Sequence, residues 1–250
     1  MTNIVKRNVQ AIKNLLPWMA QPTIKIVSHA GAPYVTDMTT IKLASSVKPD
    51  WLLRQKDNAK REKFVNCPGM DDMLQAGYLL CAWTDIHIKA NLSGISVKLL
   101  NDCNLKPEYM SHIPVQGIAK IASNVKLQVM KLPTPWCVFT KAGYSAQVLP
   151  AAFHSPFLDD IYVYPGIVDY DKFSSINFIF SALRECELTI PAGTPLLQII
   201  PFHRETITAE VGRATLLEYD KHVYGFPTRV RAAYRKFYHQ RKKFTLKART

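Results

Sequence analysis

The chain has 250 residues, of which 48% are hydrophobic and 20% are charged. This composition is typical of a globular protein with a buried core, and it excludes intrinsic disorder and collagen-like repeats. Lysine and arginine number 32 against 19 acidic residues, which gives a formal net charge of +13. Such a balance favours nucleic acid, an acidic protein or an anionic surface as a partner.

The five cysteines are scattered along the chain and form no C-x-x-C pair. This pattern indicates neither a disulfide framework nor a zinc site, so we expect a reducing compartment and no bound metal. The beginning of the chain has no apolar run long enough for a secretory signal. No segment reaches the ~20 apolar residues of a membrane-spanning helix. We therefore expect a protein that is not secreted and has no membrane span.

The first part of the chain predicts helical structure. Apolar side chains from Ile4 to Leu16 recur at roughly helical intervals, and Asp37 is the first acidic residue. We expect an N-terminal extension over residues 1–63 that is partly helical. Asp71 and Asp72 follow near the start of a predicted short helix, where the helix dipole favours negative charge. We interpret these two residues as capping groups rather than as a catalytic pair.

From Tyr78 onward, short runs of β-branched and aromatic residues alternate with Pro, Gly and Asn. Their spacing of about ten residues is typical of sandwiches and barrels rather than of alternating βαβ units. The sequence therefore predicts a mostly-β core over residues 64–218. The expected strands lie within residues 78–90, 95–100, 125–131, 136–140, 144–149, 161–164, 176–181, 187–190 and 196–202.

One turn in this region carries a carboxylate. Gly166 permits a tight turn, Asp169 follows at the exit of a strand, and the aromatic Phe173 comes soon after. Gly193 then turns the chain into a strand with one inward polar group, Gln198. Asp169 suits either a functional acid or an ordinary turn acid that accepts hydrogen bonds from nearby amides. Gln198 suits either a ligand contact or a core amide with backbone partners.

The order of these residues resembles a known family. G-x-V-D, an aromatic residue, a strand and then I-x-x-G-T-P-L-x-Q-I-I are similar to the third and fourth motifs of the trimeric dUTPase and dCTP deaminase superfamily. Residues 135–150 resemble the strand that leads to the second motif. The resemblance covers residues 133–202 and implies a β-clip fold with a distorted-barrel core, assembled as a homotrimer. The chain also resembles proteins of tailed bacteriophages, which implies a location in the host cytoplasm or the virion.

The resemblance also implies roles for individual residues. Asp169 matches the carboxylate that orients the attacking water, which would suit a general base lined up on a phosphorus atom. Phe173, displaced by one position, matches the aromatic residue that packs on deoxyribose. Gly166 and Gln198 lie in the same nucleotide-binding motifs, and Mg²⁺ would bridge the phosphates.

The chain departs from the family where phosphates are bound. Ala151-Ala152-Phe153 stands in place of an Arg-Ser run, and two alanines supply no side-chain donor for a triphosphate. A Gly-rich C-terminal lid is missing, and Ile179 stands where a deaminase has its catalytic Glu. We therefore expect that the fold is retained and that the family's chemistry is lost.

Three functional hypotheses follow. The first is a dUTPase-like binding or virion structural module of phage type, catalytically inactive and without a cofactor. The second is an active nucleoside triphosphate pyrophosphatase that uses Asp169 and Mg²⁺, with Arg184, Arg204 or Arg213 in place of the missing arginine. The third is a viral β-sandwich structural protein unrelated to the family.

Other polar residues carry weaker signals. Asp85 and His87 share one face of a strand because the side-chain period is two, and His154 has no partner in the sequence pattern. A catalytic serine at Ser145 or Ser155 would need an orienting third group and an oxyanion site, and the spacing indicates neither. We assign these residues no catalytic role.

The last 30 residues carry ten basic residues and no acidic one. Aromatic residues alternate with the cations, and apolar residues fall at helical spacing after Thr228, a good N-cap residue. The pattern predicts a basic, aromatic helix or tail over residues 219–250. It suits nucleic acid, an acidic groove on a neighbouring subunit or a larger assembly such as a virion protein, or a solvated face over a core. The expected partner contacts are Arg229, Arg231, Arg235, Lys236, Arg241, Lys242 and Lys243.

Overall fold

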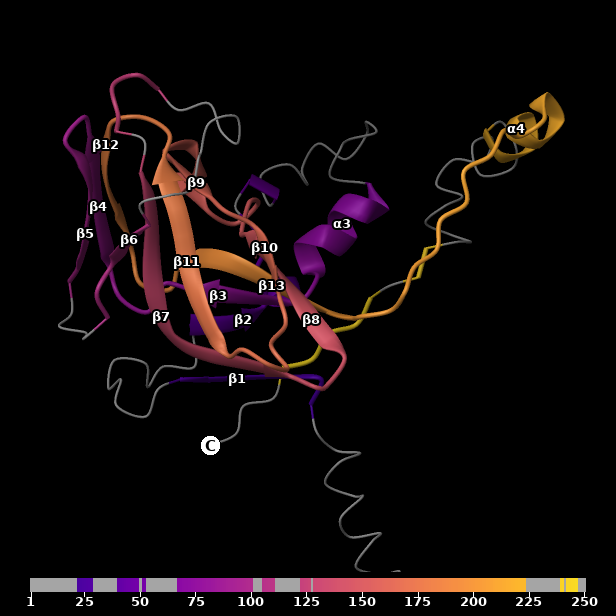
Figure 1. The fold of residues 1–250 in the computed structure, drawn as a ribbon, viewed down its shortest axis with the longest axis horizontal. Coiled ribbons are helices and arrows are strands. Elements are labelled where there is room, and N and C mark those ends of the chain that lie inside the picture. Colours follow the sequence, from indigo (N-terminus) through magenta and orange to yellow (C-terminus); the bar gives the residue numbers. More distant parts are fainter. Residues whose placement is uncertain are drawn as a thin grey trace, which may run out of the picture.

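The computed structural model describes residues 22–28, 40–49, 51–52, 67–100, 105–110, 122–126, 128–223, 239–240 and 242–246. This part of the chain is mostly β-structure, which confirms the expected fold class (Figure 1). The described strands form three antiparallel sheets and no closed barrel.

The first sheet contains the longest strand. It has the order β1 (Ile24–Ser28), β7 (Val129–Thr140), β11 (Ser175–Ala182) and β9 (Ile161–Val163), with β6 (Glu108–Met110) also paired with β7. The second sheet has the order β10 (Gly166–Val168), β8 (Tyr144–Pro150), β13 (Pro195–His203), β3 (Tyr78–Cys81) and β2 (Ile41–Leu43). The third sheet has the order β12 (Cys186–Ile190), β4 (Ile86–Asn91) and β5 (Gly94–Leu99).

Helices are few and short in the described residues. They are η3 (Ala44–Ser46), α3 (Pro68–Gln75), η6 (Pro156–Asp159) and α4 (Leu216–Val223). Asp71 lies in the first turn of α3, which agrees with its expected place near a helix start. The expected helices at residues 4–16 and after Thr228 lie outside the described residues.

Two strands precede the expected start of the β core at residue 64. β1 pairs with β7 along its whole length, and β2 pairs with β3. The sheets therefore recruit residues from the segment expected to be a separate N-terminal extension. β1 and β2 were not expected because they have only five and three residues. Alternation of apolar and polar residues over so short a run does not identify a strand.

A single main core joins the three sheets. Leu132 and Phe178 from the first sheet, Ile199 from the second and Ile88 from the third are all fully buried in it. The ring of Phe178 meets that of Phe157 edge to face, with centroids 6.3 Å apart. Burying side chains of this size is the dominant favourable contribution to folding. The sheets therefore form one body that fixes the loops at their ends.

After β13 the chain leaves this body as an exposed arm (Figure 1). Every described residue from 205 to 221 is exposed, and α4 lies at the far end. The helix begins after Thr215, whose Oγ1 accepts the Glu218 N–H at 3.3 Å, while the Glu218 carboxylate accepts the Thr215 N–H at 2.9 Å. This reciprocal capping box stabilises α4 from within.

Candidate functional site

The predicted carboxylate lies at one end of the second sheet. Ser145 of β8 pairs with Phe202 of β13, and Val168 of β10 pairs with Ala146 of β8. This register places Ser145 beside the residues that directly follow β10 and β13. Those residues are Asp169, with Asp171 two positions on, and Arg204. We call the four side chains of Ser145, Asp169, Asp171 and Arg204 the Asp169 corner.

One guanidinium holds both carboxylates of this corner. Asp169 Oδ1 accepts a hydrogen bond from the Ser145 hydroxyl at 2.5 Å and lies 2.9 Å from Arg204 Nη1. Arg204 also donates through both terminal nitrogens to Asp171, with Nη1 3.0 Å from Oδ1. The Gly143 N–H donates to Asp171 Oδ2 at 3.1 Å. Because both terminal nitrogens of Arg204 bond one carboxylate, the pairing fixes the orientation of the guanidinium and also compensates the negative charge of Asp171.

The two carboxylates differ in exposure but both favour the ionised form. The Asp169 side chain is 52% exposed and that of Asp171 only 8%. The hydrogen bond from Ser145, followed by that from Arg204, lowers the pKa of Asp169. The hydrogen bond from Arg204 lowers the pKa of Asp171. In return, Asp171 first and then Asp169 raise the pKa of Arg204.

This arrangement limits what Asp169 can do chemically. A general base acts best when its pKa is near the working pH and when it lies within hydrogen-bond reach of the attacking water. The pKa of Asp169 is shifted in the opposite direction, and its Oδ1 is already shared by a hydroxyl and a cation. The corner therefore has the properties of a structural ion-pair network.

The corner is also poorly suited to Mg²⁺. Of its carboxylate oxygens, Asp169 Oδ1 and both oxygens of Asp171 already accept hydrogen bonds from Ser145, Arg204 or Gly143. A magnesium ion needs several oxygen ligands in near-octahedral geometry, so it would have to displace the guanidinium. Within the described ranges, no three His, Cys, Asp or Glu side chains gather closely enough to hold a metal ion.

Of the three arginines considered as replacements for the missing one, Arg204 alone reaches the corner. Arg184 Nε donates to Asp160 Oδ1 at 2.7 Å, on the surface near η6. Arg213 lies on the exposed arm. Sequence reasoning missed Asp171, because it lies in the turn after β10, where the Lys172 N–H donates to the Asp169 carbonyl and strand alternation does not apply.

Gly166 and Phe173 lie on the surface beside the corner. Gly166 begins β10, has no positive φ, and has no atom within 4 Å of where a Cβ would be. A tight turn therefore does not require a glycine there, contrary to expectation, whereas Gly193 has a φ of +82° as its turn requires. Phe173 is 57% exposed, and its N–H donates to the Asp169 carbonyl.

Gln198 lies inside the protein rather than at the corner. Its side chain is 1% exposed, and Nε2 donates to the Met73 carbonyl at 2.8 Å and to the Ala76 carbonyl at 2.7 Å. Both amide hydrogens are thus used to hold the end of α3 on β13. This geometry agrees with the interpretation of Gln198 as a core amide with backbone partners.

Three of the weaker candidates, Asp85, His87 and Ser155, have structural partners. Asp85 Oδ1 accepts the Ala192 N–H at 2.7 Å and fixes the turn before β13. His87 of β4 contacts Glu187 and Thr189 of the neighbouring strand β12. The Ser155 hydroxyl donates to the Pro195 carbonyl. These contacts account for the side chains without a catalytic role.

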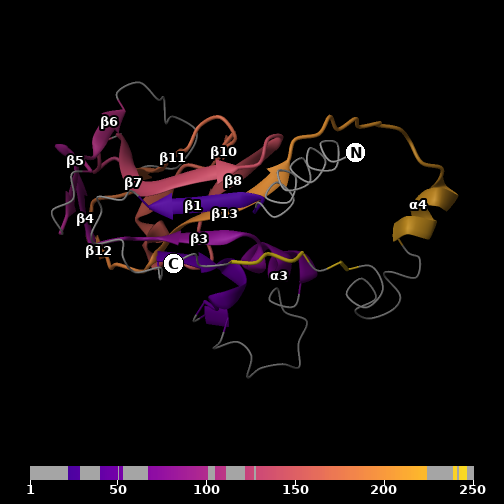
Figure 2. The same cartoon turned by 90° about the horizontal axis from the view of Figure 1, so that it is seen from below.

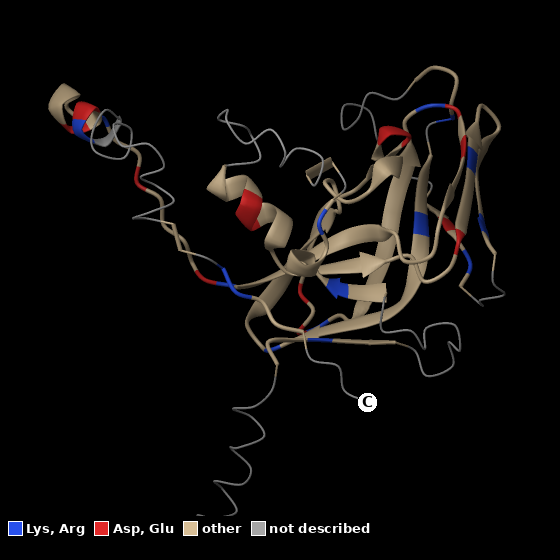
Figure 3. Cartoon of the chain, turned by 180° about the vertical axis from the view of Figure 1, so that it is seen from behind, with Lys and Arg blue, Asp and Glu red and all other residues tan. Residues whose placement is uncertain are grey.

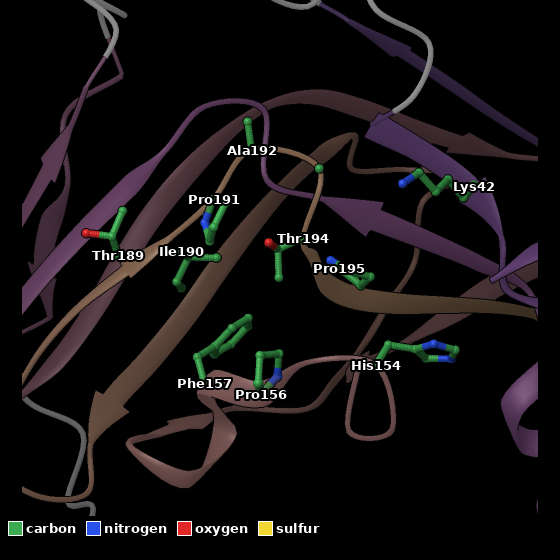
Figure 4. A pocket seen from close by; sticks show the side chains of 11 residues that line it. Lys42, His154, Pro156, Phe157, Thr189, Ile190, Pro191, Ala192, Thr194 and Pro195 are labelled. Carbon is green, nitrogen blue, oxygen red and sulfur yellow. The ribbon is translucent and has the colours of Figure 1, made fainter. Parts of the chain in front are cut away.

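Figure 4 shows a pocket of about 520 Å³ whose lining includes no residue of the Asp169 corner. It is formed mainly by the turn between β12 and β13, with η6 and β2 at its sides. The lining residues are Lys42, His154, Pro156, Phe157, Thr189, Ile190, Pro191, Ala192, Gly193, Thr194 and Pro195. Lys42 is the only Lys or Arg among them, so the pocket offers little to a polyanion.

Most of the expected partner contacts lie outside the described residues. These are Arg229, Arg231, Arg235, Lys236 and Arg241. Lys243 is exposed, whereas Lys242 forms an ion pair with Asp72 of α3. Residues 242–246 have no regular secondary structure.

Comparisons with known proteins found matches only among solved structures. No protein-family model matches the sequence. No curated protein matches it either. Among solved structures, native EIAV dUTPase matches with 13% identity and a TM-score of 0.32, covering 61% of this chain and 89% of its own. A mutant dUTPase from phage phi11 of S. aureus, described with a structural Mg(II) ion, matches with 8% identity and a TM-score of 0.33 over 78% of this chain and 99% of its own.

The described helices also bear on the expected absence of a membrane span. None of them combines the length and the apolar character that crossing a bilayer would require.

Replacing Arg204 with methionine should weaken the fold in a pH-dependent manner. Asp169 and Asp171 have folded-state pKa values below their ordinary values. Their stabilisation is therefore complete above about pH 4 and is lost as the pH falls through the lowered pKa values. We expect R204M to unfold at a lower urea concentration at neutral pH, with a difference from wild type that shrinks towards about pH 2.5.

Urea unfolding at neutral and acidic pH measures this effect. R184M is the matched control, because it breaks an exposed pair with Asp160, and such pairs contribute little. A difference between R204M and wild type that stays constant with pH would contradict the proposed role of Arg204.

Proposed function

We propose that this protein is a non-catalytic binding or virion structural module of phage type, located in the virion or the host cytoplasm. The observation that carries this proposal is the Asp169 corner, where Ser145 and Arg204 occupy the carboxylate that a dUTPase-like reaction would need. An ion-pair network of this kind stabilises a loop, and a carboxylate bound within it is a poor base for activating water.

The region expected to bind phosphates supports the same proposal. Ala151 is fully buried beside Leu79 and Cys81, and the neighbouring Ala152 presents only a methyl group. Neither residue offers a charged or polar side chain to a triphosphate. Arg204 could not replace the missing arginine without releasing Asp171.

An enzyme assay separates this proposal from the pyrophosphatase alternative. We expect the protein to release no pyrophosphate from dUTP or dCTP with Mg²⁺ above the buffer background, and Asp169→Asn to behave identically. Turnover that is abolished by Asp169→Asn would refute the inactive module and establish the enzyme.

The acidic partner is the second part of the proposal. Lys and Arg are interspersed with Asp and Glu over the described body (Figure 3). By contrast, residues 221–250 contain basic residues and no acidic one. Concentrated cations with interleaved aromatic rings suit the phosphates and bases of a single strand. We place the contact with nucleic acid or an acidic virion protein on this tail.

Binding of single-stranded DNA at several salt concentrations tests the tail. Removing three cations with R229Q/R231Q/R235Q should lower the slope of log affinity against log salt by about 2, since each phosphate contact contributes about 0.7. K98Q/K106Q/K126Q is the matched control, because these lysines are exposed on the body. Equal slopes for the two triple variants would contradict a contact through the tail.

We also propose that the chain is a homotrimer. The arm offers a surface for contact between copies, since Ile207, Val211 and Leu217 are each more than 80% exposed. Apolar side chains of this size favour burial against a neighbour. Light scattering of the intact protein should give the mass of three chains.

A further inference from the structure

The chain returns to the body after the arm. Residues 239–240 and 242–246, here called the C-terminal strap, lie beside α3 and β3 (Figure 2, yellow). The chain leaves the body at Arg204, which is held by Asp169 and Asp171. The chain is therefore attached to the body at two places. One is Arg204, before the basic tail begins, and the other is the strap, near the end of that tail.

Asp72 on α3 contacts two side chains of the strap, His239 and Lys242. His239 Nε2 lies 3.0 Å from Asp72 Oδ1, and Lys242 Nζ donates to Oδ2. The side chains of Asp72 and His239 are only 18% and 13% exposed. Burial alone would raise the pKa of Asp72, but the hydrogen bonds from Lys242 and His239 outweigh it and lower that pKa. Asp72 is thus a charged acceptor, and bonds to such acceptors are stronger than neutral ones.

An apolar contact anchors the other end of the strap. The rings of Phe244 and Tyr78 meet edge to face, with centroids 6.2 Å apart, and Phe244 packs against the main core. The Tyr78 hydroxyl donates to the Thr245 carbonyl at 3.0 Å. Tyr78 is 7% exposed, so the strap supplies the partner that a nearly buried hydroxyl needs.

These contacts involve one of the residues expected to bind the acidic partner. Lys242 is held by Asp72, while the adjacent Lys243 is exposed. We infer that the strap is a clasp that holds the end of the basic tail on α3, and that single-stranded nucleic acid competes with Asp72 for Lys242 and opens it. The second half of this inference rests on the proposed function, and the clasp itself does not.

Tryptic cleavage after Lys242 and Lys243 in the intact protein measures opening of the clasp, because proteolysis follows the population of the open form. We expect Asp72→Asn to accelerate this cleavage about tenfold, since it removes a charged acceptor shared by two donors. Phe244→Ala removes the apolar anchor and should act in the same direction. Asp71→Asn is the matched control on the same helix, because Asp71 bonds Gln75 rather than the strap.

Binding of a fluorescent single-stranded oligonucleotide completes the test. We expect Asp72→Asn to bind it several-fold more tightly than wild type and Asp71→Asn to bind it equally. Unchanged cleavage in both Asp72→Asn and Phe244→Ala would overturn the clasp. Faster cleavage with unchanged oligonucleotide affinity would overturn the competition. Faster cleavage without any oligonucleotide binding, in wild type or variant, would support the clasp and overturn the proposed nucleic-acid partner.

Discussion

Replacing Gly77 with alanine should destabilise the protein by about 2 to 5 kcal/mol, through an unfavourable backbone conformation and overpacking together. Gly77 joins α3 to β3 with a φ of +66°, a backbone conformation that residues other than glycine rarely adopt. An added Cβ would lie 2.0 Å from the Ile199 carbonyl oxygen. Because that oxygen belongs to the backbone of β13, it cannot rotate away as a flexible side chain could.

The effect should extend to the edge of the second sheet. The Gly77 carbonyl accepts the Ala44 N–H at 3.1 Å, directly after β2. Displacing Gly77 from β13 would therefore disturb the attachment of β2 as well as the end of α3. Urea unfolding followed by circular dichroism measures the loss.

Gly166→Ala is the matched control for this substitution. Gly166 has no positive φ, and no atom lies within 4 Å of its added Cβ. We expect a change within about 0.5 kcal/mol, as for most surface substitutions. Similar losses for the two variants would show that neither φ nor close approach explains the effect at Gly77.

The second large effect is expected for Gln198→Leu, which should cost about 2 to 4 kcal/mol. The substitution leaves the Met73 and Ala76 carbonyls without the donor that Gln198 provides, and an unmet buried polar group costs about 1 to 3 kcal/mol. Leucine is similar in size, so the loss of packing is small. We expect α3 to detach before the sheets unfold.

Hydrogen exchange localises this loss, because amides of α3 should exchange faster than those of β7. Gln147→Leu is the matched control, since Gln147 is exposed on β8 and pairs with Ile200 of β13. Uniform acceleration throughout the protein would contradict a local role for Gln198, and an effect as large in Gln147→Leu would contradict the hydrogen-bond explanation.

The sequence predicted the strands better than their arrangement. Nine runs of alternating apolar residues were expected from Tyr78 onward, and β3, β4, β5, β7, β8, β9, β11, β12 and β13 lie in or overlap them. β1, β2, β6 and β10 were missed because each has only three to five residues and becomes a strand by pairing with β7, β3 or β8 elsewhere in the sequence. Local alternation cannot encode such long-range pairing.

Long-range pairing also explains why only part of the candidate site could be predicted. The motif around Asp169 directed attention to the turn where Ser145 and Arg204 contact that carboxylate, and Arg204 was one of three arginines considered for it. The sequence could not select Arg204, because its place depends on the register of Phe202 opposite Ser145. A shift of one residue would turn the side chains of β13 to the opposite face of the sheet.

The strap has a consequence for the integrity of the chain. Residues between Arg204 and His239 are joined covalently at both ends to segments that bind the body separately. A protease that cut one peptide bond within this span would leave two fragments, and Phe244 and Lys242 would still attach the smaller one to the larger. Nicked molecules would then migrate as intact under native conditions and separate only when denatured.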